Sequence, residues 1–194
     1  LRKVLKVRRA QLPATDTAVL SARVDLGDAL YRQGEMRAAL QNYVRAVTDA
    51  ATLAPSDDLR VAAESGRARV LFAQGHMQQA LSLQRGLYAQ LQPLLPATDP
   101  NILLLRSDLV LTLMGVGQRQ QAIQQSRSLV KLYRQSLGDE DPRTLDAMLT
   151  LAKLLHYRYE YEQSLTLARQ VAAIRERRLG ADPPARCARS RESR

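Results

Sequence analysis

The chain has 194 residues, 45% of them apolar, with no Trp and a single Phe, so Leu, Ala and Val supply most of the apolar content and favour helices. Its formal charge of +10 is concentrated at the ends, because residues 1–12 and 185–194 carry all but +2 of it, which argues against a basic nucleic-acid surface along the middle. The only cysteine, Cys187, excludes an internal disulfide and a thiolate metal cluster, and the apolar runs are too short to span a membrane.

Residues 1–12 have the pattern of the second half of a helix. Set against residues 170–181 near the other end of the chain, they align as the end of a hairpin. We expect this helix to pack on the hairpin that follows and to fray at its start. Its apolar side consists of Val4, Leu5, Val7 and Leu12. The alignment and the absence of an initiator Met predict at least one further unit before residue 1.

Two sequence markers recur in phase from residue 12 onward. The string Gly-x-x-x-x-Ala-Leu begins at Gly34 and Gly75, and related strings begin at Gly117 and Tyr159, in steps of 41, 42 and 42. A Leu-rich linker that carries Asp begins at positions 12, 53, 95, 137 and 179, at the same period. The markers predict four repeats over residues 13–53, 54–95, 96–137 and 138–180.

Each repeat is predicted to be a helical hairpin, because apolar residues recur at helical spacing on both sides of the Gly. The Gly suits a positive φ at a helix C-terminus, and the linker Asp suits an N-cap. Tyr159 breaks this rule, so we expect a reshaped or strained turn there. The Ala after each Gly is expected to be small because the two helices cross there. Residues 185–194, rich in Arg and Ser, are predicted to be a disordered basic tail.

The first repeat resembles the tetratricopeptide pattern through Leu26, Gly27, Leu30, Gly34, Ala39, Tyr43 and Ala46. The longer period and the joints at residues 133–145 and 173–184 are similar to the 42-residue subtype of kinesin light chains and of many bacterial regulatory proteins. This resemblance implies an all-α fold, a right-handed α-solenoid of stacked antiparallel hairpins. The Asn pairs with which kinesin light chains hold cargo peptides are absent from the matching positions, so the resemblance does not imply cargo recognition of that type.

The resemblance also implies that the first helix of each hairpin lines a concave groove, where a partner would bind. The candidate groove residues are Asp28, Tyr31, Arg32, Ser65, Arg69, Phe72, Ser107, Leu111, Met114, Lys153, His156 and Tyr157. An alternative interpretation places Phe72, Leu111 and Met114 in the core between repeats. Tyr157, Tyr159 and Tyr161 either cover the end of the last hairpin or form a docking edge.

No pattern indicates catalysis, a cofactor or a metal site. The two histidines, His76 and His156, lie on different predicted hairpins, whereas metal ligands must converge on one point. We therefore expect a non-catalytic, cytoplasmic interaction scaffold that binds a protein or peptide, as part of a larger bacterial regulatory protein. The alternative is a helical repeat that binds RNA or DNA through its basic ends.

Overall fold

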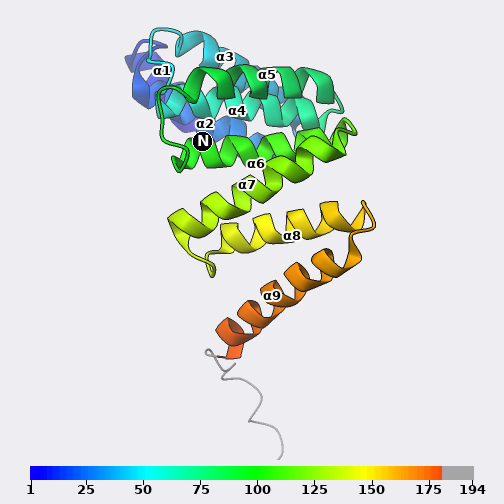
Figure 1. Ribbon diagram of the computed structural model, residues 1–194. Helices are drawn as coiled ribbons and strands as arrows, with labels where there is room; N and C mark the ends of the chain where they lie inside the picture. The colour runs from blue at the N-terminus through cyan, green and yellow to red at the C-terminus, as the bar shows by residue number, and fades with distance from the viewer. Residues whose placement is uncertain (181–194) are drawn as a thin grey trace, which may run out of the picture. The chain divides into compact units, whose positions relative to one another are not determined.

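The computed structural model describes residues 1–180, and their secondary structure is entirely helical (Figure 1). The helices are α1 (Arg2–Gln11), α2 (Thr17–Arg32), α3 (Met36–Asp49), α4 (Asp58–Ala73), α5 (Met77–Leu91), α6 (Pro100–Gly115), α7 (Arg119–Leu137), α8 (Pro142–His156) and α9 (Tyr161–Gly180). Contacts divide them into two compact units, Leu1–Leu132 and the part from Tyr133 onward, each of which we describe by itself. The predicted all-α fold is confirmed, and the predicted disordered tail lies outside the described residues.

An aspartate begins the first helix of every hairpin. Asp16, Asp57, Asp99 and Asp141 each accept a hydrogen bond from the backbone amide two residues later, at 2.8, 3.0, 2.8 and 2.8 Å. All four have the extended ψ of an N-cap, and Pro follows directly in α6 and α8. These bonds satisfy amides that a helix start leaves without an acceptor, as the linker pattern predicts.

The turns inside the hairpins share one geometry. Gly34, Gly75 and Gly117 have φ of +79°, +84° and +79°, as predicted for helix ends that close through a left-handed residue. Tyr159 has φ +63°, and the hydrogen bond that closes its turn, Glu160 N to Leu155 O at 3.0 Å, matches Glu35 N to Leu30 O at 2.9 Å. Of the two expected outcomes, the strained turn is therefore confirmed: the turn keeps its form, and the tyrosine adopts the strained conformation.

Two rows of helices build the first unit. The helices α2, α4 and α6 pack against one another in sequence, whereas α3 and α5 pack on the first row with little contact between themselves (Figure 1). The helices α2, α4 and α6 are therefore called the inner row of this unit, and α3 and α5 its outer row. The inner row carries the residues predicted to line a groove in this part of the chain.

The N-terminal helix α1 packs on α2, as expected, but with one apolar residue. Leu5 is 9% exposed, whereas Val4, Val7 and Leu12 are 43%, 57% and 37% exposed. The expectation that all four side chains pack on the first hairpin is thus wrong for three of them. They lie on other sides of a helix whose narrow contact with α2 uses Leu5.

Small residues lie at the helix crossings. Ala39, Ala80 and Ala122 have no exposed surface, in agreement with the expected close approach of the two helices. In the last hairpin the residue is Ser164, whose hydroxyl donates to the carbonyl oxygen of Ala152 at 2.8 Å. The bond gives the partly buried hydroxyl an acceptor, which lets Ser replace Ala at this crossing.

The second unit is built on the hairpin of α8 and α9, which pack along each other. Met148, Leu154 and Leu155 of α8 and Val171 of α9 are at most 2% exposed and form its core. Within residues 1–180, none of the helices combines the length and the apolar character that crossing a membrane requires.

Candidate functional site

Three charged side chains meet on the α2–α4–α6 face of the first unit, one from each of its three inner helices. Arg69 of α4 lies between Asp28 of α2 and Asp108 of α6. Its guanidinium is 3.6 Å from Asp28 Oδ1 through Nη2 and 3.9 Å from Asp108 Oδ2 through Nε. We call these three residues the charged triad. Because it carries two carboxylates and one guanidinium, it has a net negative charge.

The carboxylates of the charged triad differ in their surroundings. Asp28 is one-third exposed and accepts a hydrogen bond from the Tyr43 hydroxyl, and burial together with this bond raises the pKa of Tyr43. Burial raises the pKa of Asp108 from 3.8 to about 6, against the attraction of Arg69. Since the folded pKa lies above the unfolded one, this carboxyl contributes stability that is present below pH 3.8 and is lost as the pH rises through about 6.

The contact between Arg69 and Asp108 is an ion pair without a hydrogen bond. Arg69 Nε and Asp108 Oδ2 are both buried and have no hydrogen-bond partner among the described residues. Their separation of 3.9 Å is too long for a hydrogen bond. The charged triad is therefore held by charge attraction. The Nε–H donor of Arg69 and the Oδ2 acceptor of Asp108 stay unused, and a small shift of either side chain could offer them to a ligand.

Apolar side chains run beside the charged triad, one helical turn further along. Tyr31, Phe72 and Met114 are half-buried, and Leu111, three residues after Asp108, is 43% exposed. A Cβ at Gly115 would lie 3.0 Å from Phe72 Cε2, so Phe72 packs against α6. The alternative interpretation, in which these residues belong to the core between repeats, therefore holds in part for Phe72. It does not hold for Leu111, whose side chain faces solvent.

The polar candidate residues on the same helices differ in how much of their surface is exposed. Arg32 is exposed at the end of α2 and Ser107 is half-buried on α6. Ser65 is only 5% exposed on α4, so it is not accessible to a ligand, and its prediction as a groove residue is wrong. Sequence reasoning placed Ser65 by its position in the repeat, which does not show how closely neighbouring helices approach.

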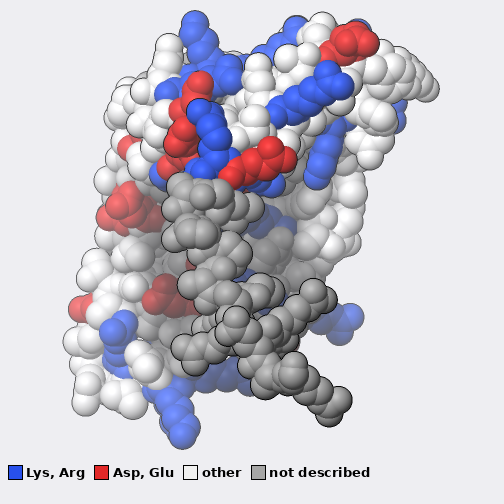
Figure 2. All heavy atoms as spheres, turned by 90° about the horizontal axis from the view of Figure 1, so that it is seen from below, with Lys and Arg blue, Asp and Glu red and all other residues white. Residues whose placement is uncertain are grey.

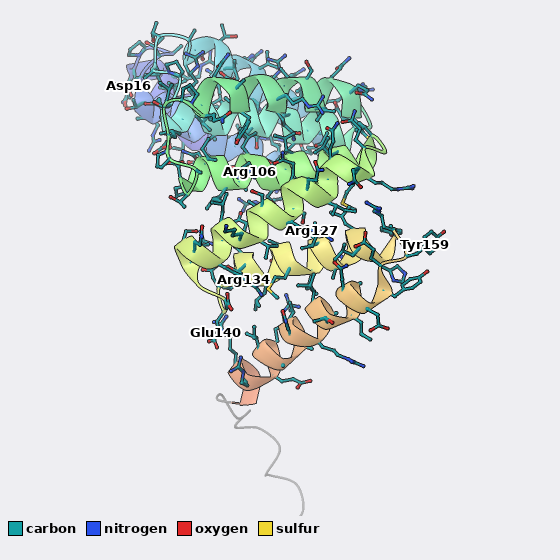
Figure 3. All side chains as sticks on the ribbon, viewed as in Figure 1. Asp16, Arg106, Arg127, Arg134, Glu140 and Tyr159 are labelled. Atoms are coloured by element: carbon teal, nitrogen blue, oxygen red, sulfur yellow. The ribbon has the colours of Figure 1, made fainter. Side chains whose placement is uncertain are left out.

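The second unit holds the remaining candidates, Lys153, His156 and Tyr157, all of them exposed. The His156 ring makes edge contacts with Tyr161 at 5.2 Å and Tyr157 at 6.2 Å between centroids, and Tyr159 contacts Tyr161 at 5.9 Å. Tyr157, Tyr159 and Tyr161 are 62%, 78% and 50% exposed. Tyr159 lies at the turn between α8 and α9 (Figure 3). Both interpretations of these tyrosines, as a cover of the hairpin end and as a docking edge, remain predictions.

Charge on the surface is mixed. On the face that Figure 2 displays, basic and acidic side chains are interspersed among uncharged ones and form no continuous basic surface. Over residues 1–180, no group of three or more His, Cys, Asp or Glu is arranged to hold a metal ion.

Sequence reasoning missed Asp108 with its ion pair to Arg69, and Tyr43 with its hydrogen bond to Asp28. Asp108 lies one helical turn before Leu111 and therefore on the same face, which was the available signal. Its pairing with a residue 39 positions earlier depends on how α4 and α6 stack, which the sequence of either helix alone does not show.

Residues 144–185, which include most of the last hairpin, match the family model described as a tetratricopeptide repeat. The solved structures with a similar fold include a putative kinesin light chain with nearly identical TPR-like repeats from Podosopora anserina, at 23% identity and a TM-score of 0.73, covering 91% of this chain and 84% of that one. They also include BtubC (BKLC) from P. vanneervenii, at 16% identity and a TM-score of 0.78, covering 91% and 71%.

A further similar structure is residues 41 to the end of MamA from Desulfovibrio magneticus RS-1, at 15% identity and a TM-score of 0.61, covering 84% of this chain and 77% of that one. No curated protein sequence matches the chain. The predicted resemblance to tetratricopeptide repeats is confirmed over residues 144–185 by the family match. The fold of the chain is similar to that of tetratricopeptide-repeat structures, which include a putative kinesin light chain.

Proposed function

We propose that the chain, whose fold is that of a tetratricopeptide-like α-solenoid, is a protein-interaction scaffold and that the α2–α4–α6 face of its first unit is a groove that binds an extended segment of a partner protein. The charged triad of Asp28, Arg69 and Asp108, which joins three consecutive inner helices, carries this proposal. A ligand that contacts it touches all three hairpins of the unit at once.

The chemistry of this face favours a segment with both basic and apolar side chains. Asp28 is one-third exposed and belongs to a cluster of net negative charge, so it can accept a hydrogen bond from a ligand ammonium, guanidinium or backbone N–H. Leu111 and the half-buried Met114 lie one turn apart on α6 and offer apolar contact. Met and aromatic side chains are enriched where proteins bind one another.

The proposal can be tested by selecting peptides from a displayed random library on the full 194-residue chain. Binding of the recovered peptides to Leu111→Ser and Val44→Ser is then compared by fluorescence anisotropy. Both residues are 43% exposed, but Leu111 lies on the inner helix α6 and Val44 on the outer helix α3. We expect Leu111→Ser to weaken binding about tenfold, the effect of losing one well-buried apolar contact, and Val44→Ser to leave it unchanged.

Equal losses in the two variants, or peptides enriched in acidic residues, would contradict the proposed face. The alternative function, nucleic-acid binding through the basic ends, predicts instead that the full chain binds RNA or DNA with an affinity that falls steeply with salt. The role within a larger bacterial regulatory protein, and any groove role for Lys153, His156 and Tyr157, remain predictions from the sequence.

A further inference from the structure

Three side chains at one position of the repeat form a line across the α2–α4–α6 face of the first unit. Asp28, Arg69 and Leu111 each lie six residues before the turn glycine of their hairpin. Because the three turns share one geometry and the three helices pack in sequence, equal distance from the turn places these side chains at the same level. We call them the 28–69–111 row.

The 28–69–111 row is accessible to solvent along its length and changes in character from α2 to α6. The side chains of Asp28 and Arg69 are each 32% exposed, and Leu111 is 43% exposed. The row therefore runs from a carboxylate through a guanidinium to an apolar side chain. A ligand that follows the row meets a different chemistry at each inner helix.

The α2 side of the row carries negative charge that Arg69 does not neutralise. Arg69 is the only cation of the charged triad, and it is shared between Asp28 at 3.6 Å and Asp108 at 3.9 Å. Asp108 is only 14% exposed, so Asp28 is the carboxylate that a ligand reaches. A basic side chain of the ligand is therefore favoured at Asp28 and disfavoured over Arg69.

A second row runs beside the first, one helical turn nearer the hairpin turns. Tyr31, Phe72 and Met114 each lie three residues before the turn glycine, and all three are half-buried. A ligand on the 28–69–111 row thus has an apolar flank along its whole length. The order of charged and apolar residues in the ligand is consequently set by the 28–69–111 row.

The distance from Asp28 to Leu111 sets the spacing of those residues. Axes of packed helices lie about 8–10 Å apart, so these side chains, two helices apart, are separated by about 16–20 Å. Six residues of a strand or of a polyproline II segment span about 19–20 Å. A separation of six also returns a side chain to the same side in both conformations, because their side chains repeat every two and every three residues.

We propose, building on the function proposed above, that this face selects extended segments with a basic residue and an apolar residue six positions apart. The basic residue lies at Asp28 and the apolar residue at Leu111. The residue halfway between them lies over Arg69 and is not basic. Asp28 and Leu111 are then the specificity-determining residues of the site.

The test uses displayed peptide libraries in which one arginine and one leucine are fixed and all other residues are random. The two fixed residues are three, six or nine positions apart, in either order. The libraries compete for the full 194-residue chain, and the recovered peptides are counted by sequencing. We expect the six-position library to be enriched at least about threefold over the other two, with lysine and arginine depleted halfway between the fixed residues.

Matched variants of α6 show whether Leu111 contacts the apolar ligand residue. Leu111→Ser should abolish the preference for six positions, whereas Leu104→Ser should retain it. Both leucines lie on α6 and are similarly exposed, at 43% and 46%. Leu104 precedes Leu111 by seven residues, which places it about 10 Å from the row along the helix axis.

Matched variants of α2 test the basic ligand residue in the same way. Asp28→Asn keeps an oxygen acceptor for the Tyr43 hydroxyl and should abolish the preference for arginine. Asp25→Asn should retain it, because Asp25 is exposed at the repeat position of Gly66, which faces Tyr43 of α3 instead of the row. Circular dichroism of each variant checks that the helices are retained.

The outcomes separate this proposal from the function on which it builds. Equal enrichment of the three libraries, in peptides that still require Leu111, would overturn the spacing and leave the proposed function intact. Recovery of no peptide that depends on Leu111 would overturn both. An equal loss of the arginine preference in Asp25→Asn and Asp28→Asn would indicate general charge attraction and would also overturn the proposed row.

Discussion

The first hairpin, α2–α3, and the last, α8–α9, have the same turn geometry around different interiors. Arg23 and Asp49 of the first hairpin occupy the positions that Met148 and Ile174 occupy 125 residues later. Arg23 is 4% exposed and 3.2 Å from Asp49, whereas Met148 and Ile174 are 0% and 9% exposed. A buried ion pair and an apolar pair therefore serve one place in the fold, so the repeat specifies the shape of the hairpin and not the polarity of its interior.

The ion pair of the first hairpin is incompletely satisfied. Burial lowers the pKa of Arg23, while Asp49 opposes this shift. Arg23 Nε and Asp49 Oδ2 have no hydrogen-bond partner among the described residues. Removal of two charges from water costs several kcal/mol per ion, about as much as the attraction between them returns. The pair therefore adds little net stability, although loss of one partner would be costly.

Asp49→Ala should have the largest effect of the changes considered, because it leaves the Arg23 guanidinium buried without its counter-charge. We expect the free energy of unfolding to fall by about 3 kcal/mol, the lower end of the range for a broken buried pair, since Asp49 is 20% exposed. Chemical denaturation followed by circular dichroism measures this change.

The last hairpin provides both the control and the reverse experiment. Asp146→Ala removes an exposed partner of Arg175, at 3.0 Å, and should cost less than about 1 kcal/mol. The double variant Arg23→Met/Asp49→Ile places the residues of the last hairpin in the first and should return the stability to within about 1 kcal/mol of the wild type. A double variant as unstable as Asp49→Ala would show that the two interiors are not interchangeable.

Gly66→Ala should be the next largest effect, because it tests the second difference between the hairpins, Tyr43 in place of Ala168. A Cβ on Gly66 would lie 2.2 Å from Tyr43 Cε1, and this ring is 1% exposed and bonded to Asp28 through its hydroxyl. Overpacking of this kind costs about 1–3 kcal/mol, and the helix propensity of Ala returns up to about 1. We expect a net loss that thermal denaturation detects.

Gly86 on α5 is the matched control for Gly66, since both are helical glycines. A Cβ there would have no neighbour within 4 Å, so Gly86→Ala should raise the stability by about 0.5–1 kcal/mol. Equal effects of the two substitutions would contradict the role of Gly66 as the space into which Tyr43 fits.

The sequence predicted the features that recur, because each one has a local cause. Asp57 caps α4 and Gly75 ends it through hydrogen bonds within a few residues, so the period alone locates them. Arg23 was not predicted as a buried residue, since a charged side chain on a helix is normally solvated and its partner lies 26 residues away on another helix. Stacking of hairpins, which the sequence of one repeat does not contain, likewise buries Ser65 and brings Asp108 to Arg69.

Tyr159→Gly is the smallest expected effect and has the opposite sign, because it gives the last hairpin the turn residue of the other three. The left-handed conformation of Tyr159, at φ +63°, costs a non-glycine residue about 1–2 kcal/mol, and its side chain is 78% exposed. Loss of the edge contact with Tyr161, at 5.9 Å, gives back about 0.5–1 kcal/mol of this gain. We expect the variant to be more stable by roughly 0.5–1 kcal/mol in chemical denaturation.

Gly75→Ala is the control in the opposite direction. Its φ is +84° and a Cβ there would contact nothing, so the substitution isolates the cost of the backbone conformation and should lower the stability by about 1 kcal/mol.

If Tyr159→Gly instead lowers the stability, the contacts of the exposed tyrosine outweigh its backbone strain. If it raises the stability as expected, the chain retains a strained, exposed aromatic residue where glycine would be more stable, as occurs at binding sites. The exposed rings of Tyr157 and Tyr161 beside it are then the first place to seek a partner of the second unit.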